Sequence, residues 1–505
     1  MNKCIRKPQP EKRIAVHKID PEPLIENKSM PAGFFNLTAI LLFFFFLVSG
    51  SCTSTRYFGK TSIPGNFLND PAISDTHVGV AIYDAGSEKY IYTHNSDKFF
   101  LPASNIKLAT LYAGLKYLGD SIPGMQYSVH NDTVYLFPTG DPTFMLLDFP
   151  VQPVLDFLIN VEKPVVFIEP HWRTGSLGYG WPWNFYLDYY MPERSPFPIY
   201  GNGMIWAQKE MAGLDEDVMV TLVSSYPRHP WQVEIKDGGN EKFEVIRPVT
   251  VNDYTVYPGL EGDREMFVPF ATNGMQAALE LLKDTLKKDI MVAPCGAAFI
   301  NQRGLPVRSG IKDFPFTDHH SGITVHPEHP GTIYSRPADS LFRPMMHYSD
   351  NFYAEQTLLM ISQKLFGVMD ETLLIDYLLE NDFKYLPHPV RWVDGSGLSR
   401  YNLFTPESIV WLLGKMKDEY GFDRTSRLLP TGGEGTLKNH YMDEKRKIYA
   451  KTGTLGGNAV SLSGYIVTKG GRNLIFSVLV NNHYKASDEV RSATESFLKE
   501  IIRRY

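Results

Sequence analysis

A serine and a lysine stand three residues apart in "PASNIKLAT", residues 102–110, at the start of a helix-like segment. At about 100° per residue, Ser104 falls in the middle of the apolar stripe formed by the leucines that follow, and Lys107 falls at its edge. A serine hydroxyl becomes a good nucleophile when a base takes its proton, and a lysine amine is that base only when neutral. Because burial lowers the pKa of a lysine, the expected placement favours a nucleophile with its base.

The pair alone is weak evidence, because Ser-x-x-Lys is expected about twice by chance in a chain of this length. A serine near a helix N-terminus beside a solvent-reaching lysine is then the better explanation. Two further tripeptides follow, "SDN" at 349–351 and "KTG" at 451–453. Each is expected only about 0.1 times by chance. The three motifs in this order therefore indicate one catalytic site.

With these motifs the sequence resembles the serine penicillin-binding proteins and β-lactamases. The long gap between the first two motifs resembles the gap found in the S13 family of D-alanyl-D-alanine carboxypeptidases and endopeptidases. These are the class C low-molecular-mass penicillin-binding proteins. Five further segments agree: "GDPTF" (140–144), "GWPW" (180–183), "MMHYSDN" (345–351), "DGSGLSRYN" (394–402) and "GEGTL" (433–437).

The resemblance implies an acyl-enzyme mechanism on peptides that end in D-alanyl-D-alanine. Ser104 would attack the carbonyl carbon, and Lys107 would accept its proton. Ser349 would relay a proton to the leaving amine. Asn351 would hold the substrate amide and orient the base. Lys451 would be a second cation that lowers the pKa of the base and attracts the terminal carboxylate.

The resemblance also implies a set of substrate-binding residues. Thr452 and Thr454 would hydrogen-bond the terminal carboxylate, and the backbone N–H of Thr454 would form an oxyanion hole with that of the nucleophile. Gly453 would let the substrate lie against the strand edge. Asp350 is expected in the same site. Arg400 either contacts the stem peptide or is a surface or structural cation.

Two segments near these motifs are less informative. "DGSG", with Asp394 and Ser396, is best explained as a turn. The family often carries paired acids after its Trp-x-Trp element, where they can meet a substrate ammonium. This chain has Asn184 and Phe185 there, which weakens the expectation that a side-chain amine is recognised.

Neither a metal nor a cofactor is expected. Four histidines cluster near Glu328, but their spacing fits no standard ligand pattern, so a loop with solvated imidazoles is favoured; they are His319, His320, His326 and His329. The three cysteines form neither a zinc pattern nor a disulfide framework. Cys295 is expected to be a small buried residue.

The N-terminal segment predicts export. An apolar run at residues 34–48 is shorter than the roughly 20 residues that span a bilayer, and positively charged residues precede it. "SGSC" follows, so a lipoprotein signal cleaved before Cys52 is favoured over an uncleaved short anchor or a plain cleaved signal. All three predict a periplasmic protein, attached to the membrane by a lipid or an N-terminal anchor in the first two.

The elements predict an α/β chain. Strand and helix patterns in the outer parts, together with the resemblance, imply a DD-peptidase-like transpeptidase fold, an antiparallel sheet with a helical subdomain. The expected division is a tail and signal at 1–52, a penicillin-binding domain at 53–125 plus 320–505, and an inserted β-rich region at 126–319. Within the insertion, "WQVEIKDGGNEKFEVI" (231–246) predicts two strands joined by a Gly-Gly turn.

The leading hypothesis is a serine-type D-Ala-D-Ala carboxypeptidase or DD-endopeptidase, with peptidoglycan stem peptides as substrates and β-lactams as inhibitors. A β-lactamase is less favoured, because no short loop after "SDN" supplies an acid to activate water. A catalytically silent peptidoglycan-binding or β-lactam-sensing protein is less favoured because every catalytic position is filled. The net charge of −6 argues against nucleic acid as a partner. The sequence leaves the oligomeric state open.

Overall fold

The computed structural model describes residues 67–130, 132–212, 219–236, 241–293, 316–318, 323–325 and 331–505. The N-terminal segment with Cys52, the four clustered histidines and Cys295 lie outside these residues. Among the described helices, none combines the length and the apolar character needed to cross a bilayer. In this same part of the chain, no group of three or more His, Cys, Asp or Glu side chains is arranged to hold a metal.

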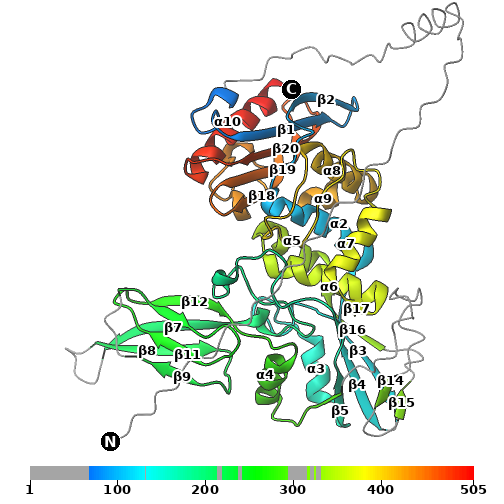
Figure 1. Cartoon of the computed structure of the whole chain (residues 1–505), viewed down its shortest axis with the longest axis vertical. Coiled ribbons are helices and arrows are strands. Elements are labelled where there is room, and N and C mark those ends of the chain that lie inside the picture. Colours follow the sequence, from blue (N-terminus) through cyan, green and yellow to red (C-terminus); the bar gives the residue numbers. More distant parts are fainter. Residues whose placement is uncertain are drawn as a thin grey trace, which may run out of the picture. The chain divides into compact units, whose positions relative to one another are not determined.

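A five-stranded antiparallel sheet joins the two ends of the described chain (Figure 1). Its order is β18-β19-β20-β1-β2. The strands are β1 (His77–Asp84), β2 (Lys89–His94), β18 (Ile448–Leu455), β19 (Ala459–Val467) and β20 (Asn473–Asn481). The strand patterns predicted in the outer parts of the chain are thereby confirmed, and the "KTG" motif lies on the edge strand β18.

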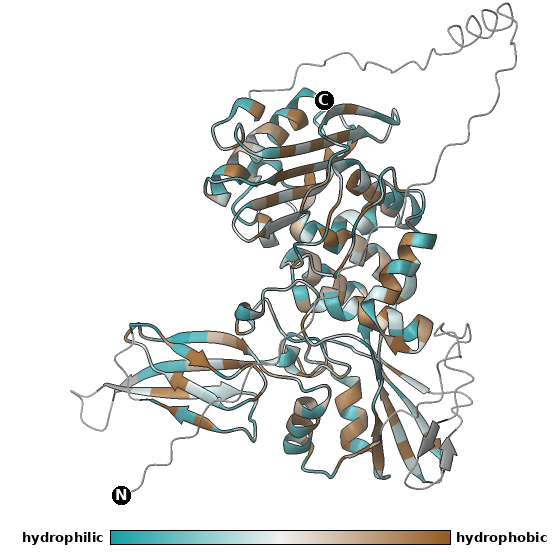
Figure 2. Ribbon diagram, in the orientation of Figure 1, coloured by the Kyte–Doolittle hydropathy of each residue, from teal (hydrophilic) through white to brown (hydrophobic). Residues whose placement is uncertain are grey.

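Helices cover both faces of this sheet. Along β20, Ile475 and Leu479 belong to one core with α8 (Pro406–Tyr420), whereas Phe476 and Val478 belong to another with α10 (Ser487–Arg504). Because successive side chains of a strand point to opposite faces, the two helices lie on opposite sides. Figure 2 shows apolar residues along these strands. Near-continuous burial follows from this two-sided cover.

A helical cluster packs around α2 (Lys107–Tyr117). Its other members are α5 (Asp339–His347), α6 (Asn351–Phe366), α7 (Glu371–Asn381) and α9 (Phe422–Arg427). Every residue from 107 to 115 of α2 is buried, so the predicted single apolar stripe understates the burial. Gly114 permits this packing, because a Cβ there would lie 2.6 Å from the ring of Phe342 in α5.

The region between α2 and α5 has its own sheets and its own core. A five-stranded sheet has the order β13-β5-β4-β3-β16, formed by β3 (Ser121–His130), β4 (Thr133–Pro138), β5 (Val165–Ile168), β13 (Met291–Ala293) and β16 (Gly331–Pro337). Two helices accompany it, α3 (Pro153–Asn160) and α4 (Gln276–Leu286). Residues 121 and 337 pair across β3 and β16, so the chain enters and leaves this region at neighbouring positions.

Two three-stranded sheets complete this region, with further short pairs elsewhere. One has the order β12-β7-β8, formed by β7 (Gly203–Ala212), β8 (Met219–Tyr226) and β12 (Arg264–Pro269). The other is formed by β9 (Val233–Ile235), β10 (Glu244–Ile246) and β11 (Tyr254–Tyr257). The short pairs are β14 (Phe316–Asp318) with β15 (Ile323–Val325), and β6 (His171–Trp172) with β17 (Val368–Met369).

The hairpin expected at 231–246 is wrong in its pairing. The two strands form, but β11 lies between them, parallel to β9 and antiparallel to β10. Tyr254 and Val256 of β11 are buried in the core, whereas all three residues of β9 are exposed. Because β11 is buried, it takes the central position in this sheet. A turn pattern alone does not reveal that position.

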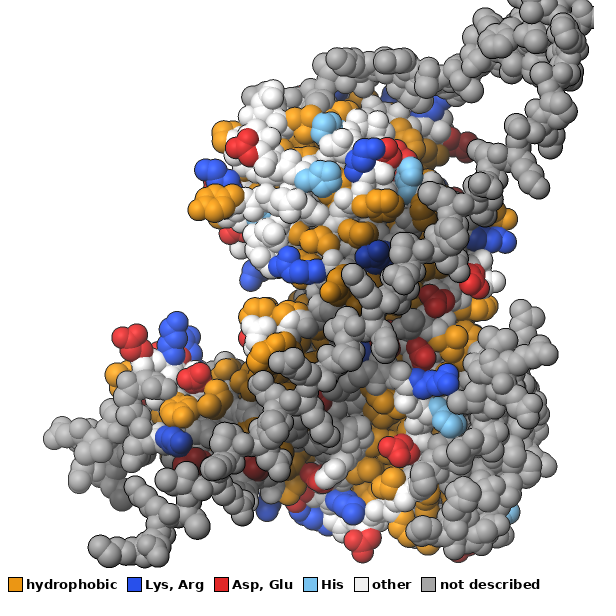
Figure 3. All heavy atoms as spheres, viewed as in Figure 1, with side chains coloured by type: hydrophobic (Ala, Val, Ile, Leu, Met, Phe, Trp, Pro, Cys, Tyr) orange, Lys and Arg blue, Asp and Glu red, His pale blue; other side chains and the backbone are white. Residues whose placement is uncertain are grey.

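On the face drawn in Figure 3, acidic and basic side chains are interspersed.

Candidate active site

Ser104 lies in η2 (Ala103–Ile106), a 3-10 turn that leads into α2. Ala103 has a positive φ of 48°, and the backbone N–H of Lys107 donates to Ser104 O. The α-helix therefore begins at Lys107, three residues later than the sequence pattern suggested. As a result, Ser104 lies at a cleft wall while Lys107 is fully buried.

The ammonium of Lys107 has three neighbours. Its Nζ is 3.1 Å from Ser104 Oγ, 2.6 Å from Asn351 Oδ1 and 2.7 Å from Ser396 O. The amide of Asn351 donates through Nδ2 to Tyr190 O at 2.8 Å, so its oxygen faces the lysine. Two of the three neighbours are thus acceptors only. A neutral amine has two N–H donors for them, which leaves its lone pair directed at the hydroxyl of Ser104.

Burial lowers the pKa of Lys107 to about 8. The carboxylates of Asp394, Asp350 and Glu355 oppose this change, because negative charges favour the ammonium. A fraction of the enzyme near neutral pH therefore has an unprotonated amine beside the serine. This is the condition that general-base activation of a hydroxyl requires.

The second lysine holds the hydroxyl of the "SDN" serine. Lys451 is fully buried, and its Nζ donates to Ser349 Oγ at 2.8 Å and to Thr452 O at 2.7 Å. Ser349 has a φ of 60°, a left-handed conformation that costs a non-glycine residue roughly 1–3 kcal/mol. The surrounding structure holds this strained residue where its hydroxyl meets the lysine.

The pKa of Lys451 is lowered well below its ordinary value, first by burial and then by the Lys107 ammonium. The sequence suggested the reverse influence, with Lys451 as the cation that lowers the pKa of Lys107. Burial, which the sequence also predicted, is the cause that lowers the pKa of Lys107.

Close packing joins β18 to the turn that carries the serine. Asn105 Nδ2 donates to Ser461 Oγ at 2.6 Å and to Lys451 O at 3.2 Å, linking η2 to β19 and β18. A Cβ on Gly453 would lie 2.9 Å from Ser104 N and 2.2 Å from Ser461 Oγ. Only glycine therefore permits this approach of strand and turn.

A cleft of about 1300 Å³ brings most of the predicted residues together. Its lining includes Ser104, Ser349, Asp350, Asn351, Arg400, Thr452, Gly453 and Thr454. The two lysines are buried behind this lining, each in contact with one of its serines.

The remaining predicted residues differ in their placement. Asp350 is the N-cap of α6 and accepts from the backbone N–H of Tyr353 at 2.8 Å, a structural role that the sequence pattern did not separate from substrate binding. Arg400 is exposed at the cleft and packs against Gly456 in the turn after β18. Phe185 lines the cleft, and its neighbour Asn184 is exposed nearby in the chain.

Several residues that contact the site were not predicted from the sequence. The "DGSG" turn forms as expected, but its Ser396 carbonyl accepts from Lys107 Nζ. Arg491 of α10 lines the cleft and donates to Thr454 Oγ1 at 2.7 Å, with its other nitrogen paired to Asp488. Arg491 lies in none of the motifs singled out from the sequence, and the "DGSG" segment alone did not predict that the Ser396 carbonyl contacts Lys107. Arg194 and Glu355 form a buried ion pair, and no sequence pattern predicted it.

A serine within reach of a desolvated lysine, backed by a second serine–lysine pair and an edge strand, defines a serine hydrolase of the penicillin-binding type. The sequence profile of the "D-Ala-D-Ala carboxypeptidase 3 (S13) family" matches residues 65–293 and 331–501. The chain belongs to this family and is a serine-type D-Ala-D-Ala peptidase.

Individual relatives agree. The chain is 26% identical over 464 residues to a D-alanyl-D-alanine carboxypeptidase of Actinomadura sp. (strain R39), covering 82% of this chain and 80% of that protein. Its fold is similar to penicillin binding protein 4 (dacB) from Haemophilus influenzae, with a TM-score of 0.64 and 17% identity over 87% of this chain and 99% of the other. A complex of that protein with a β-lactam gives a TM-score of 0.61 at 16% identity, covering 85% and 97%.

Proposed function

We propose that Ser104 is the acylated nucleophile and Lys107 its general base in the cleavage of peptides ending in D-alanyl-D-alanine. The observation that carries this assignment is the set of contacts around Lys107. Two carbonyl-type acceptors take its N–H donors, and the serine hydroxyl takes the third direction. The deprotonated serine would attack the carbonyl carbon of the penultimate D-alanine, forming an acyl-enzyme and releasing the last residue as an amine.

The second pair has a complementary role in this proposal. Ser349, within 2.8 Å of the Lys451 amine, relays a proton to the leaving amine. The terminal carboxylate of the substrate binds beside Lys451, Thr452 and Thr454. The backbone N–H groups of Ser104 and Thr454 stabilise the oxyanion. Asn351, with one N–H not used by Tyr190, holds the substrate amide carbonyl.

We propose that the stem peptide lies along the cleft, with its side chain near Arg400 and Phe185. With no acid at Phe185, the wall there favours an uncharged side chain over a free ammonium. Peptidoglycan stem peptides are the proposed substrates and β-lactams the proposed inhibitors. Either carboxypeptidase or cross-link-cleaving endopeptidase activity fits the same acyl-enzyme chemistry.

We propose a periplasmic location, with attachment to the membrane through a lipid on Cys52 or an uncleaved N-terminal segment. The support is the sequence alone, the apolar run at residues 34–48 followed by "SGSC". A family of cell-wall peptidases is consistent with action outside the cytoplasm. The proposed division remains a catalytic part at 53–125 plus 320–505 and an insertion at 126–319.

Release of D-alanine from a pentapeptide that ends in D-Ala-D-Ala tests the assignment. The wild-type protein is expected to release free D-alanine. Ser104→Ala and Lys107→Ala should each lower the rate by about a thousandfold or more, as loss of a nucleophile or its base does in serine hydrolases. Circular dichroism and melting temperature serve as folding controls. Turnover by Ser104→Ala at the wild-type rate would refute the nucleophile assignment.

A further inference from the structure

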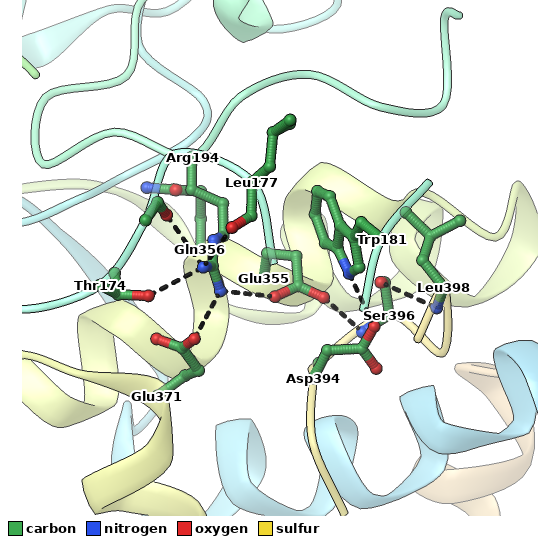
Figure 4. A network of polar contacts seen from close by, with 12 residues as sticks. Thr174, Leu177, Trp181, Arg194, Glu355, Gln356, Glu371, Asp394, Ser396 and Leu398 are labelled. Carbon is green, nitrogen blue, oxygen red and sulfur yellow. Dashed lines mark hydrogen bonds and ion pairs between the residues drawn. The ribbon is translucent and has the colours of Figure 1, made fainter. Parts of the chain in front are cut away.

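A buried network of charged residues surrounds Arg194 and Glu355 (Figure 4). Glu355 of α6 and Arg194 are at most 1% exposed, and Glu371 at the start of α7 is 7% exposed. Arg194 Nη1 is 3.3 Å from Glu355 Oε2 and 3.0 Å from Glu371 Oε1. One guanidinium therefore serves two buried carboxylates.

Arg194 lies in the region between α2 and α5, and residues of the same region hold its side chain and backbone in place. Its Nη2 donates to Thr174 Oγ1 at 2.8 Å and to Gly175 O at 2.9 Å. Its backbone N–H donates to Ser176 O at 2.7 Å, and its guanidinium lies 5.6 Å from the ring centroid of Trp181. The segment 174–194 is thus tied to the helices of the catalytic part.

The network reaches the base through one residue of the "DGSG" turn. The backbone N–H of Ser396 donates to Glu355 Oε1 at 2.7 Å, and the carbonyl of Ser396 accepts from Lys107 Nζ at 2.7 Å. Asp394 secures the same turn, accepting from Gly397 N at 2.9 Å and from Trp181 Nε1 at 2.9 Å. Both carboxylates that hold the turn therefore contact side chains of segment 174–194.

We infer that Glu355 is a positioning residue for Lys107, and that Arg194 and Trp181 make segment 174–194 part of the machinery that places the base. The contacts that carry this inference run without a gap from Arg194 through Glu355 and Ser396 to Lys107. The inference rests on the proposed role of Lys107 as base. It assigns to the inserted region a function inside the catalytic centre, beyond any contact with substrate.

Charge gives the inference a distinctive readout. Asp394, Asp350 and Glu355 each raise the pKa of Lys107, whereas Lys451 is the cation that faces it. The Glu355 carboxyl is itself close to Asp394, Glu371 and Arg194, and burial raises its pKa to about 7. Removing the charge of Glu355 while keeping its oxygen should therefore lower the pKa of Lys107 without releasing Ser396.

Glu355→Gln makes this change, because the amide oxygen still accepts from Ser396 N and Arg194 keeps its pair with Glu371. The measurement is the rate of acylation by a fluorescent penicillin as a function of pH. The acidic limb, where Lys107 becomes protonated, is expected to move to lower pH by about half a unit. Glu355→Ala, which also removes the acceptor, should slow acylation about tenfold or more.

Glu371→Gln is the matched control, since it removes a carboxylate from Arg194 without touching Ser396 or Lys107. Its acidic limb should coincide with that of the wild type. Trp181→Phe, which deletes one donor to Asp394, should slow acylation about threefold to tenfold. A merely structural network would lower the melting temperature of these variants and leave the limb in place.

An unchanged limb in Glu355→Gln, or an equal shift in Glu371→Gln, would overturn the positioning role of Glu355. A wild-type acylation rate in Trp181→Phe would overturn the part assigned to segment 174–194. Labelling that persists in Ser104→Ala would refute the proposed nucleophile instead. It would not bear on the acidic limb of the pH profile.

Discussion

At the scale of single residues, the proposed chemistry depends on the direction of the lone pair on the neutral Lys107 amine. Asn351 Oδ1 and Ser396 O each accept one N–H of the neutral Lys107 amine. Of the three neighbours, only the Ser104 hydroxyl can donate a proton to this amine. Desolvation supplies the second requirement, an amine that loses its proton within reach of neutral pH.

The pH dependence of acylation follows from this residue. With a pKa of about 8, Lys107 is protonated and inactive as a base at lower pH and neutral at higher pH. The second-order rate constant for acylation by a β-lactam should rise with pH, about tenfold per unit on the acidic side, and level off above about 8. Stopped-flow or gel-based labelling across this range measures it. A rate that falls as the pH rises through 8 would contradict the base assignment.

Motifs pointed to the residues proposed to react because each motif is local. Ser104 and Lys107 are one helical turn apart, and the "SDN" and "KTG" groups are contiguous. Arg194 and Glu355, by contrast, meet across 161 positions, and the "DGSG" segment gives no sign that the carbonyl of Ser396 contacts Lys107. Contacts of this kind depend on how α6 packs against distant segments, which no local pattern encodes.

At the scale of elements, the edge strand β18 and the turn η2 form one unit. Gly453 permits their contact, and Asn105 fastens it. The sequence predicted β18 and the role of its glycine as an open strand edge. It did not reveal that the same glycine also faces the backbone of Ser104, since that closeness arises from tertiary packing.

Gly453→Ala is expected to impair acylation more than folding. Its Cβ would sit 2.9 Å from Ser104 N, so the turn must shift, at a cost of roughly 1–3 kcal/mol. The labelling rate should fall about tenfold or more, with the secondary structure retained in circular dichroism.

Gly414→Ala provides the control for this substitution. Gly414 lies inside α8, and a Cβ there meets nothing closer than Ile475 Cδ1 at 3.7 Å. It should leave the labelling rate unchanged and stabilise the fold by roughly 0.5–1 kcal/mol. Equal effects of the two variants on labelling would remove the special role given to Gly453.

At the scale of the whole molecule, three large cores lie in the described residues. One surrounds α2, one lies between the terminal sheet and α10, and one lies among the strands between α2 and α5. The order of elements in the catalytic part could be predicted, because amphipathic helices and buried strands have strong periodic patterns. The pairing of β9, β11 and β10 could not, since non-local strand order depends on which strand the core buries.

Buried polar contacts link the helices around α2 to the region between α2 and α5. Segment 174–194 belongs to the sequence between α2 and α5, yet its Arg194 and Trp181 contact the carboxylates of Glu355 and Asp394. The proposed insertion is therefore in contact with the proposed catalytic part through buried polar groups, for which partner loss is costly.

The most direct test of the central claim is the position of the covalent adduct. The wild-type protein is incubated with a fluorescent penicillin, digested, and its labelled peptide sequenced by mass spectrometry. The predicted result is a single adduct on Ser104, absent from a folded Ser104→Ala variant. An adduct on Ser349 or on any other residue, or undiminished labelling of Ser104→Ala, would contradict the assignment of the nucleophile.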